Sequence, residues 1–94
     1  RRKWYVTPGL VDQGSETERV HLVLGKAIAD ANPDIVVLME NSVRPIIQKS
    51  MEDNGFSGEL RVEKNPLEFY TNIEHLVAVG DIVLMQNDWT DNYS

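Results

Sequence analysis

The stretch from Asp34 to Glu40 (DIVVLME) constrains the fold most, because five apolar residues follow one another in it without a polar interruption. A strand with one face in water would alternate polar and apolar side chains, whereas a strand covered on both faces reads as an unbroken, β-branched run. The competing interpretation is a buried helix. The run is short for a helix, however, and Pro33 ends the segment that precedes it. We therefore predict a central strand of a parallel sheet, covered by helices on both faces.

The segment before this strand predicts a strand and a helix. Residues 3–7 (KWYVT) are aromatic and β-branched, and Pro8-Gly9 breaks them. Ser15 and Glu18 have the spacing of a capping box, which predicts a helix from Ser15 to about Ala31. Its apolar side chains fall on one helical face: Val20, Val23, Leu24, Ala27, Ile28 and Ala31.

The segment after the central strand repeats the alternation of helix and strand. Ser42 is predicted to cap a second helix, which Asn54-Gly55 ends. Residues 59–64 alternate around Leu60 and Val62, which predicts a strand nearer the edge of the sheet.

Asn65-Pro66 then opens a third helix that Gly80 closes, and residues 81–86 (DIVLMQ) predict a second buried strand. The predicted order is β-α-β-α-β-α-β. Such alternation implies right-handed crossovers and a mainly parallel sheet. We expect a Rossmann-like, three-layer α/β/α fold and a single domain over residues 1–94.

Composition excludes several classes of protein. The net charge is −6, and the only basic run, residues 1–3, is best interpreted as a solvated end, so we expect no nucleic-acid partner. No apolar run approaches the roughly 20 residues of a membrane span. The chain has no cysteine, which fits a reducing cytoplasm. It has no initiator Met and enters a strand almost at once, so we expect a piece of a longer parent protein.

The predicted fold says where a binding site should lie, because ligands of open α/β sheets bind at the carboxyl ends of the strands. Each strand is followed there by polar residues, although any one of them could be only a helix cap or a turn residue. These residues are Thr7 before the Gly9–Gly14 loop, Glu40 and Asn41, Asn65, and Gln86, Asn87 and Asp88.

The familiar catalytic motifs are absent from the sequence. There is no phosphate-binding loop of the form G-x-x-x-x-G-K-[ST], no G-x-G-x-x-G after the first strand and no G-x-S-x-G elbow. His21 and His75 lie on separate predicted helices without metal-ligand spacing, so we predict no metal site. A half-buried packing role is favoured for His21 and a surface position for His75. Trp4 and Trp89 are expected to pack against the core or a neighbouring domain rather than to stack on a base.

Several segments, taken in order, resemble the C-terminal domain of the Mur ligase family over nearly the whole chain. The resemblance is strongest to the branch that adds D-alanyl-D-alanine to the UDP-muramoyl tripeptide. The segments that carry it are residues 5–14 (YVTPGLVDQG), His21 and Gly25 on the following helix, and residues 34–38 (DIVVL), 54–56 (NGF) and 80–84 (GDIVL).

The resemblance implies part of an ATP-dependent enzyme of peptidoglycan (cell-wall) precursor synthesis. In this family a central P-loop domain uses ATP and Mg²⁺ to phosphorylate a substrate carboxylate, which the incoming amine attacks. The C-terminal domain closes over the site and helps hold the nucleotide and the amino acid or dipeptide. By this resemblance Asp12 takes the acidic loop position and His21 the helix position, while residues 86–88 lie where the acceptor approaches. The isolated chain is expected to be inactive and to bind no cofactor alone.

Combining strand ends and resemblance, we expect seven substrate-binding residues: Thr7, Asp12, His21, Glu40, Asn41, Asn87 and Asp88. One stretch departs from the family, because a Lys-Gly-Ser-Arg sequence common after the last strand is replaced by Gln86-Asn87-Asp88-Trp89. The acceptor is therefore left open. The alternatives are a flavodoxin-like or receiver-like binding module without catalysis and a domain that only associates with other chains through Trp89 and Tyr93.

Overall fold

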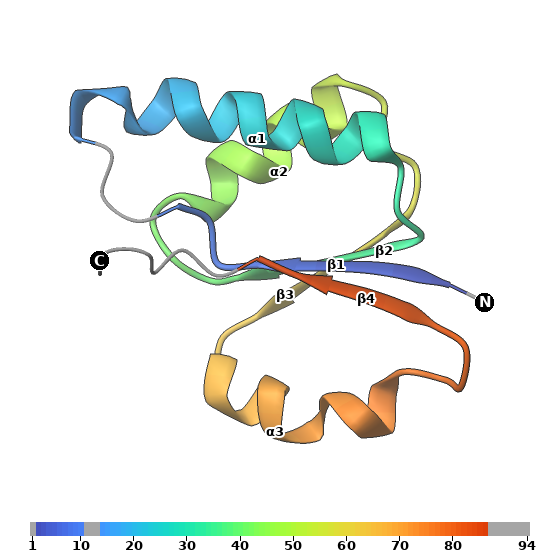
Figure 1. The fold of residues 1–94 in the computed structure, drawn as a ribbon. Helices are drawn as coiled ribbons and strands as arrows, with labels where there is room; N and C mark the ends of the chain where they lie inside the picture. Colours follow the sequence, from blue (N-terminus) through green and yellow to red (C-terminus); the bar gives the residue numbers. More distant parts are fainter. Residues whose placement is uncertain (1, 11–13, 87–94) are drawn as a thin grey trace.

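The computed structural model describes residues 2–10 and 14–86, which form a four-stranded parallel sheet between two layers of helices (Figure 1). The predicted order of elements and the predicted three-layer α/β/α fold are confirmed. The strands lie in the order β3-β2-β1-β4, with α1 and α2 on one face and α3 on the other. The elements are β1 (Lys3–Thr7), a 3-10 turn (Gly14–Glu16), α1 (Thr17–Ala31), β2 (Ile35–Met39), α2 (Arg44–Asp53), β3 (Glu59–Glu63), α3 (Pro66–Leu76) and β4 (Ile82–Met85).

Strand β2 is buried along its whole length, as the apolar run predicts. It pairs in parallel with β1 on one side and β3 on the other, so that Val36 lies opposite both Tyr5 and Leu60. All five of its residues are buried, and Val36 and Val37 have no exposed surface. The predicted position of β3 at the edge of the sheet is also confirmed.

Two apolar clusters lie on opposite faces of the sheet because side chains alternate along each strand. The cluster beneath α3 contains Trp4, Val6, Ile35, Val37, Met39 and Phe69. The cluster beneath α1 and α2 contains Ile28, Val36, Leu38, Ile47 and Met51. Burial of each such side chain contributes about 1.5–3 kcal/mol relative to exposure, so these clusters hold the two helical layers on the sheet.

Helices α1 and α2 approach closely at Gly25. A Cβ at that position would lie 2.5 Å from the Ser50 Cβ and 2.7 Å from the carbonyl oxygen of Ile47. The Ser50 hydroxyl donates a hydrogen bond across the same contact to the carbonyl of Leu22, at 2.5 Å. Gly25 therefore serves the packing of two helices here.

The structure corrects the predicted starts of two helices. Helix α1 begins at Thr17 after the 3-10 turn and has no side-chain cap, so the capping box of Ser15 and Glu18 is wrong. Helix α2 begins at Arg44, and Asn41 rather than Ser42 binds its first free amide groups. The start of α3 is as predicted, because the Asn65 side chain accepts a hydrogen bond from the Glu68 amide at 3.0 Å.

Strand β4 differs from the prediction of a second buried strand. It lies at the edge of the sheet beside β1, and 52% of Ile82, 60% of Leu84 and 39% of Met85 remain exposed. An apolar run signals burial only where both faces of the strand are covered. Strand β4 is the last strand of the sheet, and a groove between it and α1 leaves Ile82 and Leu84 partly open. Helix α3 also ends at Leu76, four residues before Gly80, which instead occupies the turn into β4 with φ +94°.

Candidate functional site

The turn after β1 (residues 8–10) lies among the polar residues predicted at the carboxyl ends of the strands. Thr7 is fully buried, and its hydroxyl oxygen accepts a hydrogen bond from the Gly9 amide at 3.0 Å. Gly9 has φ +90°, and a Cβ there would lie 2.8 Å from the Val43 side chain and 3.2 Å from Nε2 of His21. Only glycine can adopt this conformation in this space. The turn therefore packs tightly between Val43, which precedes α2, and His21 on α1.

His21 is fully buried, which is deeper than the half-buried position predicted for it. Its Nε2 accepts a hydrogen bond from the Leu10 amide at 2.9 Å, and its Nδ1 lies 2.7 Å from the carbonyl oxygen of Thr17. A carbonyl can only accept, so the proton resides on Nδ1 and the ring is in its neutral form with both nitrogens used. His21 thus ties the turn after β1 to the first turn of α1.

Asn41 holds the same turn from the other side. Its Nδ2 donates to the Pro8 carbonyl at 2.7 Å, and its Oδ1 accepts from the amides of Val43 and Arg44, each at 3.0 Å. The neighbouring Glu40 accepts from Nε of Arg44 at 3.0 Å. The carboxylate of Glu40 is therefore charge-compensated within the chain.

The structure brings four of the predicted site residues to one edge of the sheet: Thr7, His21, Glu40 and Asn41. Each hydrogen bonds to the chain itself, and three of them hold the turn of residues 8–10. These residues can order a binding loop, whereas general acid–base catalysis requires a group free to exchange a proton with a substrate. The other three predicted residues, Asp12, Asn87 and Asp88, lie outside the described residues, as do Trp89 and Tyr93.

Two further predictions about histidine and metal binding can be compared with the described residues. His75 is exposed on α3, as predicted. Residues 2–10 and 14–86 contain no group of three or more His, Cys, Asp or Glu side chains arranged to hold a metal ion. No helix within these ranges is long and apolar enough to cross a membrane.

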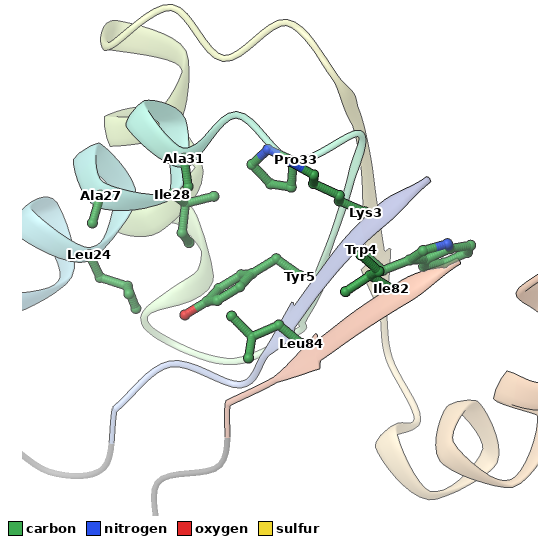
Figure 2. Close-up of a pocket in the computed structure, with 10 residues that line it drawn as sticks. All are labelled: Lys3, Trp4, Tyr5, Leu24, Ala27, Ile28, Ala31, Pro33, Ile82 and Leu84. Carbon is green, nitrogen blue, oxygen red and sulfur yellow. The ribbon is translucent and has the colours of Figure 1, made fainter. Parts of the chain in front are cut away.

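A second feature, an apolar groove between α1 and β4, was not predicted. This α1–β4 groove has a volume of about 340 Å³ and is drawn in Figure 2. Its lining residues are Lys3, Trp4, Tyr5, Leu24, Ala27, Ile28, Ala31, Pro33, Ile82 and Leu84. A shallower recess of about 260 Å³, which shares Leu24 and Ala27, continues along α1 toward Arg19. The signal in the sequence was the predicted apolar stripe of α1, because Val23, Ala27 and Ala31 of that stripe remain exposed in the structure.

A hydrogen bond joins two strands at the groove. The Tyr5 hydroxyl donates a hydrogen bond to Oε1 of Gln86, which follows the end of β4. Burial raises the pKa of Tyr5 above its ordinary value, so the phenol keeps its proton and remains the donor. The arrangement suits an apolar occupant better than a charged one.

Comparisons with protein-family models, with curated proteins and with solved structures found no match to this chain.

Proposed function

We propose that the chain is the C-terminal, site-closing domain of a Mur-type amide ligase of peptidoglycan precursor synthesis. The observation that carries the proposal is that Thr7, His21 and Asn41 meet around one turn at the carboxyl edge of a parallel sheet. The resemblance places the ligand-facing loop of the family at this turn, and the α/β/α fold agrees with it.

In this proposal the domain positions substrates and excludes water. The parent's central domain binds ATP and Mg²⁺ and forms an acyl phosphate on the UDP-muramoyl peptide, an intermediate that water would destroy. A domain that closes over it holds the amino acid or dipeptide acceptor in place, which accelerates amide formation by orientation. His21 and Asn41 serve as positioning residues, because their hydrogen bonds fix the backbone of the loop.

The experiment that tests the proposal begins with the reading frame upstream of Arg1. We expect a phosphate-binding loop of the G-x-x-x-x-G-K-[ST] type in the same polypeptide. The full parent should then release phosphate from ATP only when both a UDP-muramoyl peptide and an acceptor are present. An upstream frame without such a loop, or a parent without acceptor-dependent phosphate release, would contradict the proposal.

A matched pair of variants in the parent tests the role of the turn. His21→Gln should raise the KM for the acceptor or the nucleotide, because the loop backbone loses one of its fixed contacts. His75→Gln, at an exposed position on α3, should leave both constants unchanged. If the two variants had equal kinetic constants, His21 and the turn that it holds would not contribute to the proposed site.

A second candidate function is a flavodoxin-like binding or protein-interaction module without catalysis. The α1–β4 groove favours it, because Ile82 and Leu84 expose contiguous apolar surface of the kind that marks contact sites. The two functions differ in the parent: the ligase requires ATP hydrolysis coupled to an acceptor, whereas the module requires none.

A further inference from the structure

The floor of the α1–β4 groove is formed by two neighbouring strands. Strands β1 and β4 are parallel, and Lys3 lies opposite Ile82 while Tyr5 lies opposite Leu84. Alternate residues of a strand point to the same face of a sheet, so these four side chains lie on the face that α1 covers. The exposed fractions are 52% for Ile82 and 60% for Leu84, so the floor is largely open to a ligand.

The end of the groove at Tyr5 is suited to an apolar group. Figure 2 shows the Tyr5 hydroxyl beside Leu84 at this end. The hydroxyl donates its hydrogen bond to Gln86, so the two polar side chains here are already bonded to each other. A ligand atom that reaches this end therefore gains more from apolar contact than from a hydrogen bond.

The opposite end of the groove carries a positive charge, because Lys3 lies there beside Pro33 (Figure 2). Within residues 2–10 and 14–86 the Lys3 ammonium has no hydrogen-bond or ion-pair partner, whereas Lys26 pairs with Asp30 at 2.9 Å. The carboxylate of Asp34 accepts from the backbone amide of Lys3, at 2.8 Å, and not from its ammonium. The ammonium is therefore free to pair with an anionic group of a ligand.

We propose that the α1–β4 groove binds a small amphipathic carboxylate, with its apolar body between α1 and β4 and its carboxylate at Lys3. The apolar floor and the single cation at one end together specify this class of ligand. A nucleotide would bring several charges to a surface that offers one cation. The inference does not depend on the proposed ligase function, because Thr7, His21 and Asn41 are not among the residues that line the groove.

The size of the groove favours a small molecule over a protein partner. Its volume of about 340 Å³ is within the roughly 300–1,000 Å³ of pockets that hold small ligands. Its 10 lining residues are fewer than half of the roughly 20–30 residues per side of a stable protein interface. A second copy of the chain would need a larger surface than the groove provides.

The test is an NMR titration of the full chain with decanoate, kept below the concentration at which decanoate aggregates. We expect saturable shifts of the methyl groups of Leu24, Ile82 and Leu84. The methyl groups of Leu67, which is 76% exposed on α3 and outside the groove, should not shift. Decanol has the same apolar chain without the charge. It should bind about threefold more weakly, because an exposed ion pair contributes little.

Two pairs of variants test the two parts of the site. Lys3→Gln should weaken the binding of decanoate about threefold and leave that of decanol unchanged. Lys64→Gln is its matched control, since Lys64 is exposed and lies outside the groove. Leu84→Ser should weaken the binding of both ligands about tenfold, because the floor loses apolar surface. Leu67→Ser is the matched control for that change, and circular dichroism checks that each variant is folded.

Three outcomes would overturn the proposal. The first is the absence of saturable shifts in the groove. The second is equal affinity of the unaltered chain and Lys3→Gln for decanoate, which would remove the charge from the site. The third is a shift of Leu67 that follows those of the groove, which would indicate detergent-like binding over the whole surface. If the groove methyl groups instead shift with protein concentration and no ligand, the occupant is a second copy and the proposal is also wrong.

Discussion

The carboxylate of Asp81 accepts a hydrogen bond from the indole Nε1 of Trp4 at 3.0 Å, across 77 positions of sequence. The same carboxylate accepts from the amides of Ala78 and Arg2, each at 3.0 Å, and from the Arg2 guanidinium at 3.2 Å. Its side chain is only 2% exposed. Asp81 therefore joins the amino end of β4 to the amino end of β1. The candidate site lies at the other end of these strands, where they finish.

Replacing this carboxylate tests its structural role. Asp81→Asn should lower the free energy of unfolding, because the amide presents only one acceptor oxygen to four donors and leaves donors unpaired. The effect should exceed that of Asp53→Asn, whose carboxylate pairs with Lys49 on the surface of α2 and contributes little. Thermal unfolding followed by circular dichroism measures both. Equal melting temperatures for the two variants would show that the Asp81 contacts do not stabilise the fold.

The same residue predicts how stability depends on pH. The amide of Ala78, then that of Arg2, the Trp4 indole and the Arg2 charge hold the pKa of Asp81 well below its usual range. The unfolded chain therefore binds this proton at a higher pH than the native chain, so the stabilisation is complete above the unfolded value, about pH 4. It is lost as the pH falls from there toward the lowered pKa.

Urea unfolding at a series of acidic pH values measures this dependence. Asp81→Asn should have a shallower loss of stability below about pH 4 than the unaltered chain, because it lacks the group that titrates. The Asp53→Asn control should follow the unaltered chain. Parallel curves for all three proteins would contradict the assignment of acid sensitivity to Asp81.

His21 provides a prediction at the candidate site. His21→Phe removes a buried ring that accepts from the Leu10 amide and donates to the Thr17 carbonyl, and it leaves the Leu10 amide without this partner. An unpaired buried group costs about 1–3 kcal/mol, so we expect a loss of about 1–3 kcal/mol in the free energy of unfolding. His75→Phe on the surface of α3 should change it by less than about 0.5 kcal/mol. Urea denaturation distinguishes the two, and a small effect at His21 would mean that the turn is held mainly by other contacts.

The features that the sequence predicts well are those decided by neighbouring residues. The buried run of β2 and the cap of α3 by Asn65 depend on a few consecutive positions. The edge position of β4 does not, because the exposure of Ile82 and Leu84 depends on which helices lie over that part of the sheet. The identical apolar pattern is compatible with both outcomes.

The candidate site was likewise predictable only where neighbouring residues decide the structure. Polar residues at the carboxyl ends of the strands are predictable from the order of elements, and Thr7, Glu40 and Asn41 lie there. The burial of His21 is not, because it depends on how the turn of residues 8–10 folds back onto α1. The hydrogen bond between Tyr5 and Gln86 joins two strands that are distant in sequence, and no local pattern indicates it.

Asn41 and Ser42 are adjacent polar residues before α2, and in the structure Asn41 caps this helix. Asn41→Ala should cost about 1–2 kcal/mol, because it removes the acceptor for two helix amides and the donor to Pro8. Ser42→Ala should be nearly neutral, since no side-chain hydrogen bond of Ser42 caps this helix.

Urea denaturation of both variants tests the assignment directly. Hydrogen exchange at the Val43 and Arg44 amides adds a local readout, because these groups lose protection only when Asn41 is replaced. If Ser42→Ala were the more destabilising change, the helix would be capped as the sequence pattern suggests. The tie between Asn41 and the turn after β1 would then lose its support, and with it the reason to regard Asn41 as a residue that positions the loop.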